Sequence, residues 1–539
     1  MTATLPRSEV YAWPGACSLL PQGGSSPLSY HDLAPLDLTL PDATSELQAA
    51  VELVRGRLGR RYPLIIGERE DVARDILVSH DPAHPDSVVG EVSLGDAAHA
   101  DQAVRAAAAM APAWARVPPE ERATLLLRVA DELRRRRAEL VAWMAFETGK
   151  SFTEADGEMV ETIRHLGWVA EQLTGVKPVR WASLQADFVV EENDRPLGVG
   201  VALTPFSFPV ALPVGIAAAA IGAGNTLVLK PSRVAPITAI EALRAFRAAG
   251  LPPGVLNIVV GHGDTLREAL VSHTLTRFVA FVGSRRGGAA VQSQAALWQP
   301  DQEQARHVVA RTDGKAATLV TASADLDWAA QEVVRSAFAF QGQKCTSTAH
   351  LVLVDEIHDE FVDRLLAEVD QFCEDRGDAA SGHRYGPMIS AAALQKVRTF
   401  AHEAASYGMV LRHGDARGPG HFTGPVVVDD VYSDTPLARE EIFGPFLSIV
   451  RAGTLEHAID VTSGAGTAPA AAAFTRDLQE VARIRERLKA RTLYLNAAST
   501  GSLAGVRPPA ADGQNHHEPD DPAAFREMRT IMERYAFPH

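Results

Sequence analysis

Val199-Gly200-Val201-Ala202-Leu203, a short apolar run, is followed by a helical stretch, Pro213 to Ala223, and then by a second apolar run, Thr226-Leu227-Val228-Leu229. Short apolar runs that alternate with helices are typical of buried strands in a parallel sheet. The pattern returns at Leu256–Val260 and Phe278–Val282. The sequence therefore predicts an α/β protein with a doubly wound, Rossmann-like sheet.

A second series of strands and helices follows toward the C-terminus. Its expected strands are Ala317–Val320, Leu351–Val354, Leu447–Val450 and Thr492–Leu495. Before the first series, Asp187–Glu192 alternates between polar and apolar residues and is predicted to be a hairpin strand that turns at Asn193-Asp194. No glycine-rich dinucleotide fingerprint is complete, because the glycines after the expected strands lack their acidic partner.

The overall composition indicates a soluble globular protein of several domains. The 539 residues are 46% hydrophobic and 22% charged, with a formal net charge of −15. An acidic chain of this kind is not expected to bind nucleic acid or anionic lipid. Three cysteines at no metal-ligand spacing, no visible secretory signal and no apolar run long enough to span a membrane predict a cytoplasmic protein.

One of the three cysteines lies in an unusual setting. Cys345 stands in Gln341-Gly342-Gln343-Lys344-Cys345-Thr346, at the end of a helix-like apolar run. A structural cysteine is more often surrounded by Val, Ile and Leu and stays inert. Cys345 is therefore a candidate nucleophile, with an ordinary buried cysteine as the alternative.

Several motifs, in this order and spacing, resemble the aldehyde dehydrogenase superfamily over nearly the whole chain. The branch that the chain resembles most closely is 1-pyrroline-5-carboxylate (glutamate semialdehyde) dehydrogenase. The motifs are Thr204–Pro209 (TPFSFP), Gly224–Ser232 (GNTLVLKPS), Leu251–Asn257 (LPPGVLN), Phe281–Ser284 (FVGS), Gly342–Cys345 (GQKC) and Glu440–Pro445 (EEIFGP).

The resemblance implies a Rossmann-like cofactor domain, an α/β catalytic domain that carries the thiol, and a β-arm that pairs subunits into a homodimer or a higher oligomer. On this pattern we expect a flexible N-terminal arm at 1–40, the cofactor domain at 41–180 and 199–309, the catalytic domain at 310–491, and the oligomerisation arm and tail at 181–198 and 492–539.

The resemblance also assigns roles to residues of the cofactor site. Lys230 and Ser232 would hold the adenosine ribose of NAD, Glu441 and Phe443 would contact the nicotinamide ribose, and Gly283-Ser284 would open a helix beneath the pyrophosphate. A solvated lysine, a helix cap with a core phenylalanine, and an ordinary turn are the respective alternatives. Arg233 would accept a 2′-phosphate, which makes NADP the alternative cofactor; its own alternative is a surface arginine.

The catalytic residues depart from the family pattern. Cys345 matches the nucleophile, but Ser207 stands where the family has an asparagine that donates to the oxyanion, and Arg311 stands where it has a glutamate general base. An arginine stays protonated and cannot take a proton from water. Asp313 lies nearby as a weak substitute. The family's Pro-Phe-Gly-Gly segment reads Pro508-Pro509-Ala510-Ala511.

The substrate end of the expected site is mixed. The resemblance places six residues near a small aldehyde substrate: Glu161, Phe206, Thr346, Thr500, Gly501 and Ser502. Thr346 keeps the hydroxyl that this branch uses for the substrate carboxylate, whereas Glu161 has an exposed helical glutamate as its alternative. No metal is expected, since His516 and His517 are interpreted as solvated.

Three hypotheses stay open. The first is NAD(P)-dependent oxidation of a small acidic semialdehyde through a Cys345 thiohemiacetal, with impaired deacylation. The second is an acyl-transferring variant that passes the acyl group to another thiol, because the hydrolytic base is missing. The third is a catalytically degenerate member of the family that acts in binding or assembly. The first is favoured slightly.

Overall fold

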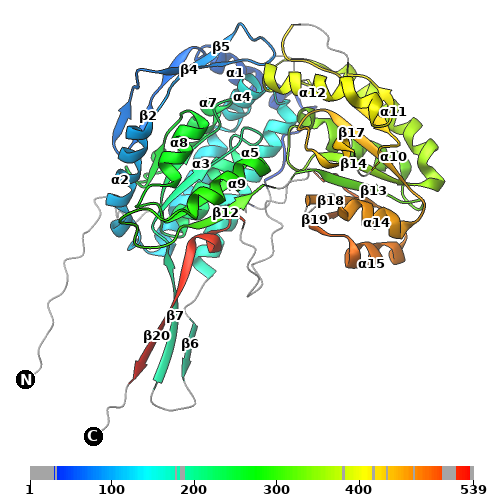
Figure 1. Ribbon diagram of the computed structural model, residues 1–539. Helices are drawn as coiled ribbons and strands as arrows, with labels where there is room; N and C mark the ends of the chain where they lie inside the picture. Colours follow the sequence, from blue (N-terminus) through cyan, green and yellow to red (C-terminus); the bar gives the residue numbers. More distant parts are fainter. Residues whose placement is uncertain are drawn as a thin grey trace, which may run out of the picture.

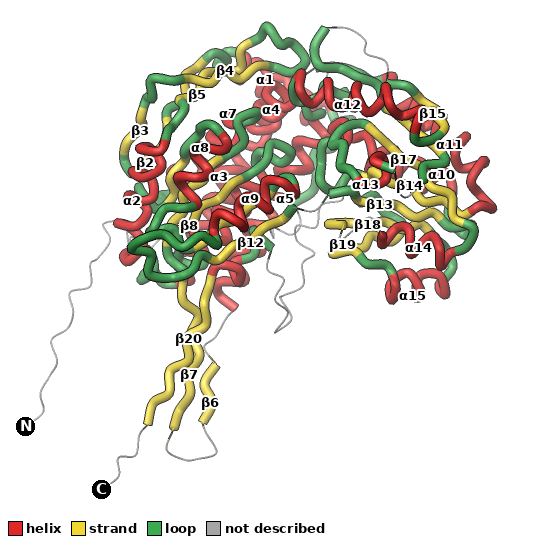
Figure 2. Tube along the Cα trace, in the orientation of Figure 1, coloured by secondary structure: helices red, strands yellow, loops and turns green. Residues whose placement is uncertain are grey.

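The structure is a computed structural model that describes residues 30, 33–175, 179–182, 188–312, 314–378, 383–414, 419–432, 435–464, 468–499 and 518–534. Two α/β lobes stand next to each other, and a long β-arm projects from the first (Figure 1). Strands occupy the middle of each lobe, with helices on the outside (Figure 2). The predicted fold class, including the cofactor-domain-like and catalytic-domain-like halves and the arm, is confirmed.

The first lobe is built on a seven-stranded sheet with the order β12-β11-β8-β9-β10-β2-β3. The strands from β8 to β12 run parallel, and every residue of β8, β9 and β11 is buried. This burial on both faces explains why their sequences are continuous apolar runs. The bounds are β2 (Leu64–Ile66), β3 (Arg69–Asp71), β8 (Val199–Leu203), β9 (Thr226–Lys230), β10 (Leu256–Ile258), β11 (Phe278–Val282) and β12 (His307–Arg311).

Helices cover both faces of this sheet. On one face lie α2, α8 and α9, and on the other lie α6 and α7 with the remaining helices outside them. Helix α6 is buried along most of its length, in keeping with its lack of polar residues. The bounds are α1 (Pro41–Arg55), α2 (Ala97–Trp114), α3 (Pro119–Arg135), α4 (Arg137–Thr148), α5 (Phe152–Gly175), α6 (Ala211–Gly222), α7 (Pro236–Ala248), α8 (Gly263–Val271) and α9 (Arg285–Ala295). A small sheet adds β1 (Arg60–Tyr62), β4 (Ile76–His80) and β5 (Val88–Ser93).

The second lobe repeats the design with the strand order β15-β16-β17-β14-β13-β18-β19. All neighbouring pairs except β15 with β16 are parallel. The strands are β13 (Ala316–Val320), β14 (Thr348–Val354), β15 (Met409–Arg412), β16 (Val426–Asp429), β17 (Phe446–Ala452), β18 (Ala468–Phe474) and β19 (Ala490–Leu495). The helices are α10 (Leu326–Phe338), α11 (His358–Glu374), α12 (Ala391–Glu403), α13 (Pro436–Arg439), α14 (Leu455–Gly464) and α15 (Leu478–Arg487). Short 3₁₀ turns are η2 (Ala339–Gly342), η3 (Asp355–Ile357), η4 (Ala404–Ser406) and η5 (Pro522–Phe525).

The arm is a three-stranded antiparallel sheet of β6 (Val179–Ala182), β7 (Phe188–Pro196) and β20 (Arg526–Arg534), in the order β20-β7-β6. The predicted turn at Asn193-Asp194 is wrong, because β7 continues to Pro196 with every residue paired to β20. A sequence pattern does not show a partner strand more than 300 residues away.

Two of the expected domain boundaries also move. The arm begins at Val179 rather than at residue 181, and residues 492–495, expected in the arm or tail, belong to β19, which pairs with β18 in the second lobe. Of the expected N-terminal arm, residues 30 and 33–40 are described, and Leu33, Leu36 and Leu38 pack against the core of the first lobe. Among the described helices, none combines the length and hydropathy that a membrane span needs.

Candidate active site

The candidate site lies where the edges of the two large sheets face each other. Lys230 and Arg311 end strands β9 and β12 of the first lobe, whereas Cys345 and Glu441 shortly precede strands β14 and β17 of the second. Ligands of doubly wound proteins bind beyond the carboxyl ends of the parallel strands. The fold brings Arg311 of the first lobe near Cys345 of the second, and Glu441 also lies near Cys345.

The loop that carries Cys345 is held in a strained shape. Phe340 and Gln341 have φ angles of 50° and 53°, in the left-handed region that non-glycine residues rarely adopt. A Cβ on Gly342 would lie 2.3 Å from the carbonyl oxygen of Gly444, so only glycine fits there. Lys344, which is 4% exposed, forms an ion pair with Glu154 of helix α5. The loop is thus fixed to both lobes.

Buried hydroxyl groups support the same loop from below. Ser336 of α10 lies 2.7 Å from the Thr348 hydroxyl and 2.6 Å from the Ser499 hydroxyl. Ser499 in turn donates to the carbonyl oxygen of Thr346 at 2.7 Å. The sequence analysis missed Ser499 as a supporting residue, because its partners come from distant segments.

The Cys345 thiol is half-buried and surrounded by charged groups. Burial raises its pKa, and the nearby carboxylates of Glu441 and Glu161 act in the same direction, whereas the guanidinium of Arg311 lowers it. Of these three charged side chains, Arg311 is the one that favours the thiolate, the reactive form of a cysteine. The structure brings Cys345, Arg311, Glu161 and Glu441 together, and it does not support the alternative of an exposed helical glutamate for Glu161.

Arg311 is held by an acidic residue that the sequence analysis did not single out. Its Nη1 lies 3.8 Å from Oε2 of Glu518, whose other carboxylate oxygen forms an ion pair with Arg491. Glu518, Asp520, Glu161 and Cys345 all raise the pKa of Arg311, although its burial lowers it. The guanidinium therefore stays charged at the position where the family has a base.

Phe206 and Ser207 lie on the loop after β8. The ring of Phe206 packs edge-on against the ring of Phe340, with 6.4 Å between the centroids, and against the ring of Phe443 at 5.7 Å. These contacts join the first lobe to the cysteine loop and to the loop of Glu441. Ser207, the next residue in the chain, is buried, with 3% of its surface exposed.

The end of β9 supplies a buried amine. Lys230 is 9% exposed, and burial lowers its pKa to about 8, with a further lowering from Arg233. Its Nζ donates to the carbonyl oxygen of Pro231 at 3.1 Å, which excludes the alternative of a solvated lysine. Arg233 is exposed, and its Nη1 lies 3.1 Å from Nδ1 of His262. Ser232 accepts a weak bond from the Val234 amide at 3.4 Å.

Gly283 and Ser284 form the turn between β11 and α9. Ser284 caps the helix, since its hydroxyl accepts from the amide of Gly287 at 3.2 Å. The free amides of a first helical turn favour an anion. The turn is therefore compatible with a phosphate group, although its capping geometry would be the same in an ordinary turn.

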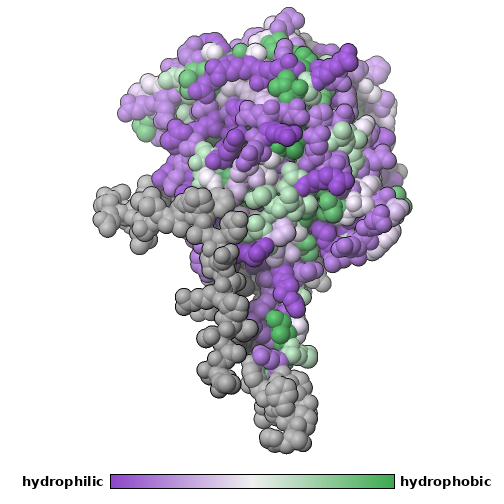
Figure 3. Space-filling model, turned by 90° about the vertical axis from the view of Figure 1, so that its left-hand side faces the viewer, coloured by the Kyte–Doolittle hydropathy of each residue, from purple (hydrophilic) through white to green (hydrophobic). Residues whose placement is uncertain are grey.

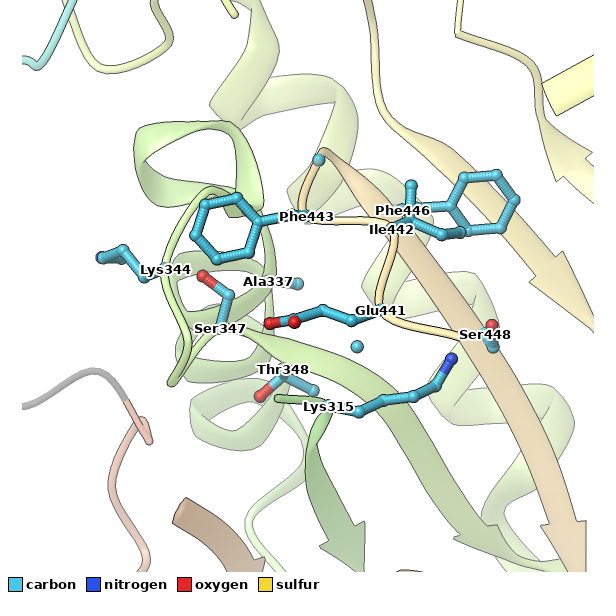
Figure 4. A pocket seen from close by; sticks show the side chains of 13 residues that line it. Lys315, Ala337, Lys344, Ser347, Thr348, Glu441, Ile442, Phe443, Phe446 and Ser448 are labelled. Carbon is cyan, nitrogen blue, oxygen red and sulfur yellow. The ribbon is translucent and has the colours of Figure 1, made fainter. Parts of the chain in front are cut away.

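A small pocket opens between the cysteine loop and the loop of Glu441 (Figure 4). The carboxylate of Glu441 points into it toward Ser347 and Thr348, and Lys315 lies beneath (Figure 4). A Cβ on Gly314 would lie 2.2 Å from the carboxylate carbon of Glu441. Glu441 is thus a pocket residue, and the alternative of a helix cap is not supported. Burial raises its pKa, whereas Lys396, Lys315 and Arg285 lower it.

Some predicted residues lie outside the described part of the chain: Asp313, Thr500, Gly501, Ser502, Pro508 to Ala511, His516 and His517. Among the described residues, His358, Asp429 and Asp430 bring three metal-ligand atoms close together. Arg451 contacts His358 Nδ1 at 2.6 Å and lies 3.9 Å from Asp430. A guanidinium at this place already balances the acidic charge, so the group is an ion-pair cluster.

The sequence and the structure both place the chain in a known class of proteins. The model of the aldehyde dehydrogenase family matches residues 70–508. The chain therefore belongs to the aldehyde dehydrogenase family, as its motifs predicted.

The similar proteins belong to a narrower group within this family. The chain is 35% identical to the 1-pyrroline-5-carboxylate dehydrogenase of Bacillus subtilis over 462 residues, which are 85% of this chain and 89% of the relative. It is 33% identical to the enzyme of the same name from Geobacillus thermodenitrificans over 478 residues, 88% of this chain and 92% of the relative. The predicted similarity to this branch is thus confirmed.

Solved structures agree with this relationship. A 1-pyrroline-5-carboxylate dehydrogenase from Thermus with bound NAD superposes with a TM-score of 0.87 at 30% identity, covering 93% of this chain and 98% of the other. A variant of the Thermus thermophilus enzyme gives the same values.

Proposed function

We propose that this protein is an NAD-dependent aldehyde dehydrogenase that oxidises a small acidic semialdehyde of the glutamate semialdehyde kind. The observation that carries the proposal is the half-buried Cys345, which lies near the guanidinium of Arg311 and the carboxylate of Glu441. The relatives named above, all 1-pyrroline-5-carboxylate dehydrogenases, support the substrate class. The residues that fit a dinucleotide, described next, support the cofactor.

The residues present fit a dinucleotide. Buried Lys230 offers ammonium hydrogens to ribose hydroxyls, the turn at Ser284 offers amides to the pyrophosphate, and Glu441 offers a carboxylate to the second ribose. Gly314 leaves the space in which that carboxylate lies. When bound, NAD accepts a hydride from the substrate carbon.

The chain's own residues would act as follows. The Cys345 thiolate, favoured by Arg311, attacks the aldehyde carbon and forms a C–S bond, and the carbonyl oxygen takes the negative charge. Ser207 takes the place of the family's asparagine and would donate to this oxygen. Loss of hydride leaves a thioester on Cys345, and water must then cleave the C–S bond to give the acid and regenerate the thiol.

Deacylation is the step that this site performs poorly. The water needs a base, and Arg311, whose surrounding carboxylates keep it protonated, cannot serve. A positioned general base contributes roughly 10²–10⁴-fold. The same observation favours a second candidate, release of the acyl group to a thiol such as coenzyme A, because a thiolate does not need that base.

The arm would assemble the protein into a homo-oligomer. Its sheet ends in β20, which has β7 on one side only, and an unpaired strand edge is a template for another chain. Met528, Ile531 and Met532 of this strand are exposed, and hydrophobic groups reach the surface of the projecting arm (Figure 3).

A rapid-mixing experiment with NAD and glutamate semialdehyde tests the proposal. We expect one rapid burst of reduced cofactor per site and then a slow steady state, because acylation outruns deacylation. The burst should vanish in Cys345→Ala. Added coenzyme A would speed the steady state if the acyl-transferring candidate is right. No burst at high enzyme concentration would contradict both candidates and leave the catalytically degenerate, binding or assembly role.

A further inference from the structure

Lys315 is a buried lysine at the base of the site. It immediately precedes strand β13 and is 5% exposed. Its φ angle is 71°, in the left-handed region, which is costly for a residue with a side chain. Burial lowers its pKa to about 7, whereas the carboxylates of Glu441 and Glu440 raise it. Such a residue needs compensating contacts.

Those contacts all go to one segment of backbone. The Nζ of Lys315 donates to the carbonyl oxygen of Glu440 at 2.8 Å and to that of Leu437. Figure 4 shows the side chain beneath the loop, with its amine toward the backbone end of Glu441, while the Glu441 carboxylate points the opposite way, into the pocket. Lys315 therefore contacts the backbone segment that carries Glu441.

Two further side chains fix the same segment from other elements. The ring of His350, on β14, lies 2.7 Å from the carbonyl oxygen of Ala438, and burial lowers its pKa to about 3, so the ring is neutral and its Nε2–H donates. Lys396, on α12, donates to the carbonyl oxygen of Glu441 at 2.7 Å, but its side chain is exposed. Residues 437–441 are thus held at four carbonyl groups, two of them by Lys315.

We propose that Lys315 is the positioning residue for Glu441: it fixes the backbone of residues 437–441 so that the carboxylate faces the cofactor pocket. This inference rests on the proposed function, since it assigns the cofactor as the ligand of Glu441. The left-handed backbone at Lys315 has a role in it, because it aims the side chain across the start of β13 to the carbonyl groups. Gly314, just before it, provides the space for the carboxylate.

The test is equilibrium binding of NADH, followed by fluorescence, in wild type, Lys315→Met and Arg485→Met. Methionine keeps the unbranched shape of lysine and removes the donors. We expect Lys315→Met to bind NADH at least about tenfold more weakly, since a misplaced contact group can cost up to about a hundredfold. Arg485→Met, the control at an exposed cation of helix α15, should change binding less than about twofold.

Two further readouts, one kinetic and one from a double variant, separate positioning from a general structural effect. In Lys315→Met the KM for NAD should rise, while the single-turnover rate at saturating NAD stays within about twofold of wild type. In the background of Glu441→Gln, Lys315→Met should add little, because residues that act through one contact are not additive. Full additivity would overturn the inference.

The remaining outcomes separate failure of the proposed function from failure of this inference alone. Wild-type protein that fails to bind NADH refutes the proposed function and the inference with it, whereas wild-type binding with equal affinity in Lys315→Met refutes the inference alone. If Lys315→Met does not fold, Lys315→Arg replaces it: the longer side chain keeps the charge but displaces the loop, so positioning predicts weaker binding. Unchanged binding in that variant would contradict positioning.

The pH dependence of NADH affinity gives a last check. The charged groups that face Lys315 are Glu441, Glu440 and Lys396, with neutral His350 alongside. A neutral amine still donates to carbonyl oxygens. Positioning by hydrogen bonds therefore predicts affinity that changes less than about threefold across pH 7. A loss of tenfold or more above pH 7 would show that the charge acts instead.

Discussion

The two sides of the candidate site differ in how far they follow the family pattern. On the cofactor side, Lys230, Ser284 and Glu441 keep the residue types that the family motifs predict: Lys230 is a buried amine, Ser284 caps helix α9, and Glu441 lines a pocket. At the catalytic positions of the family pattern, Cys345 is kept, but Arg311 stands in place of the base and Ser207 in place of the amide donor. Binding of the cofactor and turnover of the acyl intermediate can therefore vary separately.

The difference has a physical origin in what each side must supply. Cofactor binding uses backbone amides, a carboxylate and an amine, all fixed by the ends of strands. Hydrolysis of a thioester needs a proton acceptor within reach of one water molecule, and a single substitution removes it. In this chain the removal is accompanied by Glu518, which pairs with Arg311 at 3.8 Å, so the charge at position 311 is stabilised.

The largest effect is expected from restoring the base. Arg311→Glu should raise steady-state turnover roughly tenfold to a hundredfold, because a general base contributes about 10²–10⁴-fold and the neighbouring Glu518 and Glu161 raise the pKa of a new carboxylate. The initial burst should slow at the same time, since Arg311 no longer lowers the pKa of Cys345. Burst and steady-state rates measured in one experiment check both directions.

A charge-removal variant provides the control. Arg311→Gln loses the guanidinium without adding a base and should slow the burst with no gain in the steady state. Adding Ser207→Asn to Arg311→Glu should raise turnover further. Equal gains in Arg311→Glu and Arg311→Gln would show that the base is not what the site lacks.

The next effect concerns the cofactor side. Gly314→Ala adds a Cβ that would lie 2.2 Å from the Glu441 carboxylate carbon, so that carboxylate must move. We expect NADH to bind about tenfold more weakly, as for other displaced contact groups, with thermal stability changed far less. Isothermal titration and thermal melting measure the two.

Gly157→Ala is the matched control for that variant. A Cβ at Gly157, in helix α5, would meet no atom within 4 Å. It should leave NADH affinity unchanged and raise stability by up to about 1 kcal/mol, because alanine favours a helix over glycine. Weaker binding in both variants would show that the effect is not specific to Gly314.

The smallest effect is on cofactor choice. Arg233 is exposed at the end of β9 and lies beside His262. Arg233→Glu should lower the preference for NADP over NAD about threefold to fivefold, since an exposed charge contact is worth little. Ratios of kcat/KM for the two cofactors provide the measurement. Arg286→Glu, in the first turn of helix α9, should weaken both cofactors alike. An equal ratio in wild type and Arg233→Glu would leave Arg233 as a surface residue.

The sequence by itself determined the fold class and the family. Apolar runs such as Val199–Leu203 and Phe278–Val282 became fully buried parallel strands, because burial on both faces leaves no room for polar residues. The motif around Cys345 and the substitution at Arg311 could be recognised locally. The turn at Asn193-Asp194 was predicted wrongly because a local polar pair resembles a turn when the partner strand is unknown.

Only the tertiary structure decided which distant residues meet. Glu518 reaches Arg311, Ser499 supports the loop of Cys345, and Lys315 holds the segment before Glu441. None of these pairs has a signal in the sequence, since an isolated acidic, hydroxyl or lysine side chain is typical of any surface. The charge and position of a site residue depend on neighbours in space, whereas local patterns report only neighbours along the chain.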